Sequence, residues 1–176
     1  MIRFATLAAA AALAFAAPAS AQTPGLATGQ TAPAQTAADP GVSVEAVRAW
    51  LTSKGGTVSA VNREEGETWL NVTDGPLSWV IFFYSCQADV CGDIQYAASF
   101  SNPGVTQAMV NDWNRERRFL KAFFAPGEAG GDPTAVVQYD VLIHSADVEQ
   151  LADPTALWLD LVGAFGTTVG YFQASE

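Results

Sequence analysis

The sequence predicts an α+β domain in which helices flank an antiparallel sheet. Three segments space their apolar residues as amphipathic helices do, and six segments rich in β-branched and aromatic residues are typical of strands. They follow one another as helix, four strands, helix, two strands and helix. Most neighbouring strands are separated only by turn-forming stretches, which favours antiparallel hairpins because a parallel connection needs a crossover of a dozen or more residues.

The first helix is predicted to begin behind Ser43, whose side chain suits the N-cap position, and to end at Gly55 and Gly56. Its inward positions recur at helical spacing and are Val44, Val47, Trp50 and Leu51. Four strands are then predicted at residues 57–61, 68–73, 77–84 and 92–101. Turn-formers separate the first three of them, at Glu65-Gly66 and at Asp74-Gly75-Pro76.

The second half of the domain is predicted to hold a helix, a hairpin and a final helix. The helix covers residues 105–117, and its inward residues are Val105, Met109, Val110 and Trp113. The hairpin pairs strands at residues 119–125 and 135–143 across a loop rich in Gly and Pro. The last helix runs from Pro154 toward Tyr171, with Asp153 as N-cap and proline in the first helical position.

Two of these elements are more apolar than a simple two-layer domain requires. In the strand at residues 77–84, Leu77, Trp79, Ile81 and Phe83 share one face, and Val80, Phe82 and Tyr84 share the other. A half-exposed antiparallel strand would alternate with polar residues. We therefore expect a helix, a loop or a second subunit to cover each face. The last helix carries one charge, Asp160, and is expected to be buried in the core, with or without a contribution to a dimer.

The N-terminus is typical of a secretory signal peptide. Arg3 precedes an apolar run at residues 4–17, and small residues follow up to Ala21, the predicted cleavage site. The run is too short to span a bilayer, which takes about 20 residues. Residues 22–41 are rich in Pro, Ala and Thr and predict a flexible linker, and residues 42–176 predict a single domain. We expect a secreted or periplasmic protein with no membrane insertion after signal removal.

Cys86 and Cys91 are the only cysteines of the chain. An even number of cysteines in an exported protein favours pairing. Zinc normally takes four Cys or His ligands, so with His144 as the only histidine a zinc site would have to recruit carboxylates such as Asp89 and Asp93. The C-x4-C spacing also differs from the C-x-x-C of redox pairs. We expect a disulfide that closes the tip of a hairpin.

No motif in the sequence points to catalysis, a cofactor or a metal. The G-x-S-x-G, H-E-x-x-H, P-loop and Rossmann patterns are absent. His144 follows a strand end, where solvent or backbone partners suit it better than the role of a general base. The formal net charge of −10 disfavours nucleic acid and anionic membranes as partners. We expect a protein without enzymatic activity; a hydrolase that uses His144 is the less favoured alternative.

Residues 111–121 form a basic cluster in an otherwise acidic chain, with four of its eight Lys and Arg residues. Their place at a helix C-terminus favours a structural role, because positive charge there complements the helix dipole. The alternative is a binding spot for an acidic segment or an anionic ligand. Asn114 is expected to hydrogen-bond an adjacent strand. The candidate interaction residues of the chain are Trp79, Trp113, Asn114, Arg117 and Arg118.

The segment VNDWNRERRFLKAFF at residues 110–124, followed by a Gly-rich turn and AVVQYDVLI, resembles the core of the YbjN domain family of bacterial sensory transduction regulators. The similarity extends more loosely to VRAWLTSKGGTVSAV at residues 47–61 and to the C-x4-C hairpin, about residues 42–172 in all. The resemblance implies a fold similar to that of type III secretion chaperones, which are small acidic α+β proteins that dimerise and bind extended partner segments. It implies no catalytic residues.

These observations together predict a periplasmic, chaperone-like binding or regulatory domain. We expect it to hold a protein partner of unknown identity through its apolar sheet face or its last helix, and to form a homodimer. The alternative function is a sensor of a small molecule or envelope component, with an aromatic pocket formed by Trp69, Trp79 and Tyr96.

Overall fold

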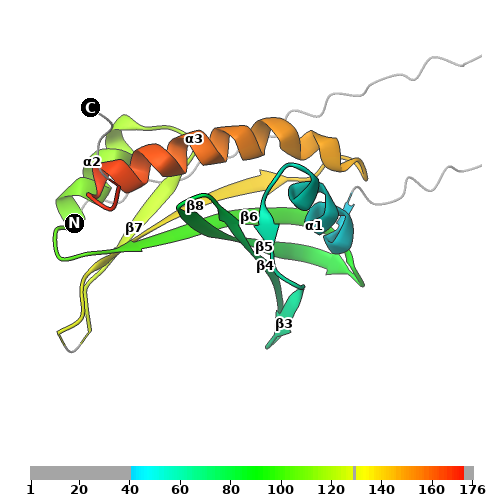
Figure 1. The fold of residues 1–176 in the computed structure, drawn as a ribbon, viewed down its shortest axis with the longest axis horizontal. Coiled ribbons are helices and arrows are strands. Elements are labelled where there is room, and N and C mark those ends of the chain that lie inside the picture. The colour runs from blue at the N-terminus through cyan, green and yellow to red at the C-terminus, as the bar shows by residue number, and fades with distance from the viewer. Residues whose placement is uncertain (1–40, 129, 173–176) are drawn as a thin grey trace, which may run out of the picture. The chain divides into compact units, whose positions relative to one another are not determined.

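The computed structural model describes residues 41–128 and 130–172 of the 176-residue chain. The predicted signal peptide, residues 1–21, and residues 22–40 of the predicted linker lie outside the described residues. Figure 1 shows the elements, which in chain order are β1 (Val42–Ser43), α1 (Val44–Ser53), β2 (Thr57–Val58), β3 (Asn62–Glu64), β4 (Glu67–Asp74), β5 (Leu77–Gln87), β6 (Val90–Ser101), α2 (Gln107–Glu116), β7 (Lys121–Ala125), β8 (Thr134–Leu142), the 3-10 turn η1 (Val148–Leu151) and α3 (Ala152–Thr168).

The strands of the described residues form one sheet of eight, and all of their pairings are antiparallel. The strand order is β2-β4-β5-β6-β8-β7, while β1 pairs with β6 and β3 pairs with β4. The long hairpin of β5 and β6 lies at the centre, with register from Val80 opposite Ala97 to Gln87 opposite Val90. The predicted α+β class, with an antiparallel sheet and three helices, is confirmed.

The predicted strand at residues 57–61 is wrong in extent. β2 ends at Val58, and the chain bends before it pairs with β4 again as β3. Ser59 accounts for the bend, because its N–H donates to the Asn71 carbonyl and its hydroxyl accepts from the Asn71 N–H, at 2.9 and 3.0 Å. β1 and β3 have two and three residues, too few to show the alternation that predicts a strand. The predicted strand start at Phe119 is also wrong, since that residue has a φ of +74° and β7 begins at Lys121.

Capping side chains mark the helix starts. The Ser43 hydroxyl accepts from the Ala46 N–H at α1, as predicted, and the Thr106 hydroxyl accepts from the Met109 N–H at α2. The predicted cap Asp153 is wrong, because α3 continues directly from η1 and Asp153 lies in its first turn. The cap of this segment is Asp147, whose carboxylate accepts from the Glu149 N–H at 2.9 Å. Within residues 41–128 and 130–172, no helix combines the length and apolarity that crossing a bilayer requires.

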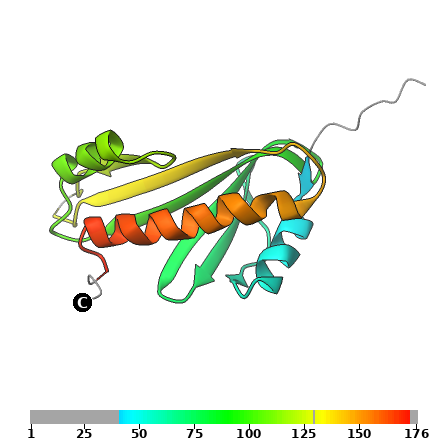
Figure 2. The same cartoon turned by 90° about the horizontal axis from the view of Figure 1, so that it is seen from above.

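The three helices all lie on one face of the sheet, and α3 crosses its centre (Figures 1 and 2). The contact between the layers is an aromatic cluster. Trp158 of α3 packs against Trp79 and Tyr96, with ring centroids 5.9 and 5.7 Å away, and these two rings meet edge to face at 5.3 Å. The Tyr96 hydroxyl is 2.9 Å from the Thr155 hydroxyl. Burial raises the pKa of Tyr96 well above its usual range, although the bond to Thr155 opposes the shift.

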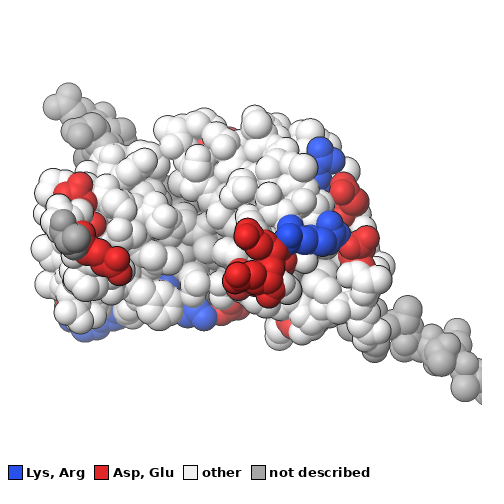
Figure 3. Space-filling model, turned by 90° about the horizontal axis from the view of Figure 1, so that it is seen from below, with Lys and Arg blue, Asp and Glu red and all other residues white. Residues whose placement is uncertain are grey.

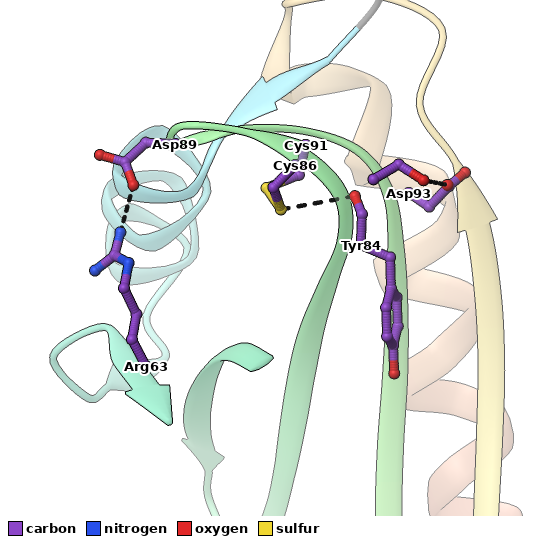
Figure 4. Close-up of a disulfide and its surroundings, with 7 residues drawn as sticks. Arg63, Tyr84, Cys86, Asp89, Cys91 and Asp93 are labelled. Carbon is purple, nitrogen blue, oxygen red and sulfur yellow. Dashed lines mark hydrogen bonds and ion pairs between the residues drawn. A yellow bond between two sulfur atoms is a disulfide. The ribbon is translucent and has the colours of Figure 1, made fainter. Parts of the chain in front are cut away.

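The tip of the β5–β6 hairpin carries the predicted disulfide. Cys86 and Cys91 are opposite each other in the register and are bonded, with Cα atoms 3.9 Å apart (Figure 4). β1 pairs with the tip on one side, and Arg63 of β3 forms an ion pair with Asp89 of the turn (Figure 4). The turn is tight, and Ala88 adopts a φ of +55°. The disulfide therefore closes a tip that two other strands also hold.

Removal of the disulfide is expected to lower the free energy of unfolding by about 2 kcal/mol, the loop-closure term for so short a loop. The variant combines Cys86→Ser with Cys91→Ala, and urea unfolding at matched m-values measures it. A reductant should lower the free energy of unfolding of the native protein by a similar amount and leave that of the variant unchanged. Equal midpoints for native protein and variant would contradict the prediction.

The hydroxyl pair in the core should behave as one unit. Tyr96→Phe and Thr155→Val each leave a buried hydroxyl without its partner, at a cost of about 1–3 kcal/mol. The double variant removes both hydroxyls, so its loss in the free energy of unfolding should be smaller than the sum of the single losses. Additive losses in denaturant titrations would show that the two hydroxyls do not interact.

Candidate functional site

The face of the sheet opposite the helices carries an open groove of about 570 Å³. It crosses β4, β5, β6 and β8, and no helix of the described residues lies on it. Figure 3 views this face, which is hollowed at its centre and bears few charged side chains there. The lining residues are Asn71, Val72, Thr73, Ser78, Trp79, Val80, Phe82, Ala97, Ala98, Ser99, Val136 and Gln138.

The groove follows from the two-sided apolar pattern of β5. On the helix side, the four alternate residues from Leu77 to Phe83 are at most 8% exposed. On the other side, Val80 and Phe82 are half-buried and Tyr84 is 43% exposed. We expected a covering element on each face of β5. Within the described chain, helices cover one face and the other is open. A second subunit on the open face stays a prediction.

Apolar side chains continue across the open face beyond β5. Trp69 on β4 lies beside Phe82, with ring centroids 6.5 Å apart. The register aligns Ala97 of β6 with Val80 on one side and with Gln138 of β8 on the other. Toward the margins, Phe123 on β7 and Leu142 on β8 are 50% and 66% exposed. The face thus combines an apolar floor with hydroxyl and amide side chains, which is a surface suited to binding.

Two charged groups lie on the β7–β8 side of this face. Lys121 Nζ donates to Asp140 at 2.7 Å, and the Gln95 side-chain amide also donates to this carboxylate. Partial burial raises the pKa of Asp140, but the hydrogen bonds from Lys121 and Gln95 outweigh it and hold the pKa below its ordinary value. Asp140 is therefore ionised at neutral pH and fully engaged, so it is a poor candidate for proton transfer.

Groups for catalysis or metal binding do not converge in the described structure. No cluster of three or more His, Cys, Asp or Glu side chains there could hold a metal ion. His144 is exposed after β8, and its backbone N–H donates to the Gln150 side chain at 2.9 Å. Among the described residues, no carboxylate or hydroxyl bonds its ring. The arrangement gives no support to the hydrolase alternative.

Two of the predicted interaction residues lie in the core. Trp79 and Trp113 are each 3% exposed, and Trp113 packs edge to face on Phe165 of α3 at 5.0 Å. Their side chains lie on the helix side of the sheet, as predicted for Trp113, and a contact of either residue with a partner stays a prediction. The aromatic pocket expected for a sensor is not formed. Trp79 and Tyr96 face the helices, whereas Trp69 lies on the open face beside Phe82, so the sheet separates them.

Arg117 and Arg118 are exposed at the C-terminal end of α2. Arg117 lies over the Trp113 ring at 5.6 Å, and Arg118 lies over the Phe119 ring at 5.0 Å. Neither forms an ion pair within residues 41–128 and 130–172, whereas Arg115 pairs with Asp112 at 2.7 Å. Their role in binding stays a prediction, and they lie away from the lining residues of the groove.

Asn114 has the structural role expected of it. Its side-chain amide donates to the Ala122 carbonyl and accepts from the Ala122 N–H, both at 2.9 Å. β7 is the last strand of the sheet, so these backbone groups face away from β8. The side chain thus occupies the place of a further strand, and it blocks one point at which another chain could pair with the edge.

Comparisons with known proteins bear on the family of the chain. Residues 43–170 match the YbjN family, described as "Putative bacterial sensory transduction regulator". No curated protein matches the chain. A similar solved structure is the "Crystal structure of YbjN, a putative transcription regulator from E. coli". It is 14% identical over 72% of this chain and 87% of that chain, with a TM-score of 0.49.

Substitution of Asn114 should destabilise the edge of the sheet. Asn114→Ala removes two hydrogen bonds and is expected to lower the free energy of unfolding by about 1–3 kcal/mol. Asn114→Asp keeps the acceptor for the Ala122 N–H but places a carboxylate beside the Ala122 carbonyl. Because protonation removes this negative charge, the loss in the free energy of unfolding should be smaller at acidic pH. Asn111→Ala, at an exposed position of the same helix, is the control. Equal urea midpoints for Asn114→Ala and the control would refute this role.

Proposed function

The chain belongs to the YbjN family, and on that premise we propose that it is a non-enzymatic regulatory domain that binds a protein partner through the groove on its open sheet face. The groove itself is the observation that supports this. It offers about 570 Å³ between side chains that are apolar at the floor and polar at the margins. Surfaces of this kind are characteristic of interaction sites.

The shape of the groove favours a protein over a small molecule. Small-molecule sites enclose most of their ligand and direct a few polar groups toward it. Here the groove is open, and the two alcohol side chains on its β4 and β5 margins, Thr73 and Ser78, are exposed to solvent. A protein partner can cover such a shallow groove completely and exclude water from it. A small ligand bound there would leave the groove in contact with water.

The proposed location is outside the cytoplasm. The disulfide at the hairpin tip supports it, because disulfides are stable mainly in oxidising compartments. The apolar run and small residues near the N-terminus support it independently. A regulatory role in that compartment requires recognition of a partner, and the net charge of −10 makes nucleic acid a poor one.

A photo-crosslinking amino acid placed at Asn71, in the groove, tests the proposal in cells that export the full chain. We expect a discrete cross-linked product that disappears when Ser99→Arg obstructs the groove. The matched control carries the crosslinker at Ala156, an exposed position of α3 on the opposite side of the sheet.

Circular dichroism and urea unfolding must first show that the Ser99→Arg protein is folded. The same products from Asn71 and Ala156, or products that persist in folded Ser99→Arg, would refute binding through the groove. Absence of any product at Asn71 would refute it as well.

A further inference from the structure

The groove also indicates what kind of segment it holds. Resting on the proposed function, we infer that the occupant is an amphipathic helix whose apolar stripe lies on the groove floor and is flanked by Lys or Arg. The inference depends on three features of the open face: its satisfied backbone, its width, and the charges on its two walls.

The backbone of the groove floor has no hydrogen bonds to offer. β4, β5, β6 and β8 are each paired on both sides, so their N–H and C=O groups are used within the sheet. An extended segment laid on this face would bury backbone groups without partners, at a cost for each group. A helix satisfies its own backbone internally. A helix is therefore the form of chain that can lie on this floor without loss of hydrogen bonds.

The width of the floor fits one helix. Four adjacent strands at about 4.8 Å spacing span about 14 Å, and a helix with its side chains is about 10–12 Å across. Two hairpins, β3–β4 and β7–β8, project from the sheet on the side away from the helices and form walls on either side (Figure 1). A single helix can lie between them and contact Val80, Phe82 and Ala97 on the floor.

Both walls are acidic. Glu64, Glu65 and Glu67 lie at the β3–β4 turn, and no ion pair within the described residues neutralises them. Exposed Glu128 and Asp132 lie in the loop between β7 and β8. Figure 3 shows acidic side chains at both sides of the hollow, with Lys or Arg beside those right of the centre and an uncharged surface between the two sides. Cationic residues along the flanks of a helix would meet these walls.

The surroundings of Tyr84, on the same open face, are also negative. Partial burial raises the pKa of Tyr84, and the charges of Glu67 and Asp140 raise it further, while Lys121 opposes them. A negative environment disfavours the phenolate, and it favours a bound cation for the same reason.

Two other occupants fit the charges poorly. A second copy of the chain would bring another net charge of −10 against acidic walls. The chain's own N-terminal segment has no Lys or Arg between Arg3 and Arg48. The groove therefore favours a cationic segment of a different protein.

Synthetic 18-residue peptides of leucine and lysine test the inference against the exported full chain by calorimetry. The first peptide places its leucines on one helical stripe, the second has the same composition in scrambled order, and the third replaces lysine with glutamate. We expect the first to bind at least tenfold more tightly than the other two. We also expect its affinity to fall with salt, since exposed ion pairs are screened.

Two protein variants locate the site. Ser99→Arg should abolish binding of the first peptide. Combined Glu64→Gln, Glu65→Gln and Glu67→Gln should weaken it about tenfold, because three exposed ion pairs contribute modestly each. The matched control, Glu45→Gln with Asp112→Asn and Glu116→Gln, changes the net charge equally on α1 and α2 and should leave the affinity within about twofold.

Equal binding of the scrambled peptide, or equal losses in the two triple variants, would reduce the effect to unspecific attraction and overturn the inference. Sedimentation that shows a dimer abolished by Ser99→Arg would assign the groove to a second copy instead. Failure of the first peptide, together with cross-links at Asn71, would overturn the cationic helix and leave the proposed function intact.

Discussion

The contact of Trp158 with Trp79 and Tyr96 determines the architecture of this domain, because it fixes which face of the sheet α3 covers. Large aromatic rings bury the most apolar area per residue, and their edge-to-face packing adds a modest directional term. The indole N–H groups of Trp79, Trp113 and Trp158 have no hydrogen-bond partner within the described protein. The cluster therefore stabilises the fold through buried area and ring contacts, and it does so despite the cost of three desolvated donors. Once α3 lies on one side of β5, the apolar residues on the other side are left in the groove.

The margins of the sheet are held by different means. At one end of β5 and β6, the disulfide, β1 and the Arg63–Asp89 pair converge on the hairpin tip. At the β7 edge, the Asn114 amide takes the place of a further strand. The Asn114 amide limits pairing of the β7 edge with other chains, since an unprotected edge is a template for association. In the proposed function, recognition takes place on the face of the sheet, where side chains rather than backbone groups would make the contacts.

The proposed function depends on two different features of the open face. The residues that line the groove carry no charge, and the strongest electrostatic feature of this face is the pair of acidic walls formed by residues of the β3–β4 and β7–β8 hairpins. Acidic walls attract a cationic segment at long range, while the apolar floor contributes to affinity only after water is expelled. Under the proposal, the walls attract the partner segment and the floor contributes the affinity.

The sequence by itself determined the α+β class, the succession of helices and antiparallel strands, and the hairpin disulfide. These depend on local signals: helical or alternating spacing, turn residues, and two cysteines between strand-like segments at a spacing that a hairpin tip can bring together. Asn114 could also be anticipated, because an amide after a buried tryptophan lies close to the next strand. The tertiary structure alone decided that Trp79 is in the core and that Val80, Phe82 and Ala97 form a groove. Both faces of β5 are apolar, so alternation cannot say which of them α3 covers. That choice depends on contacts with Trp158, some 80 residues away along the chain, and no local pattern records it.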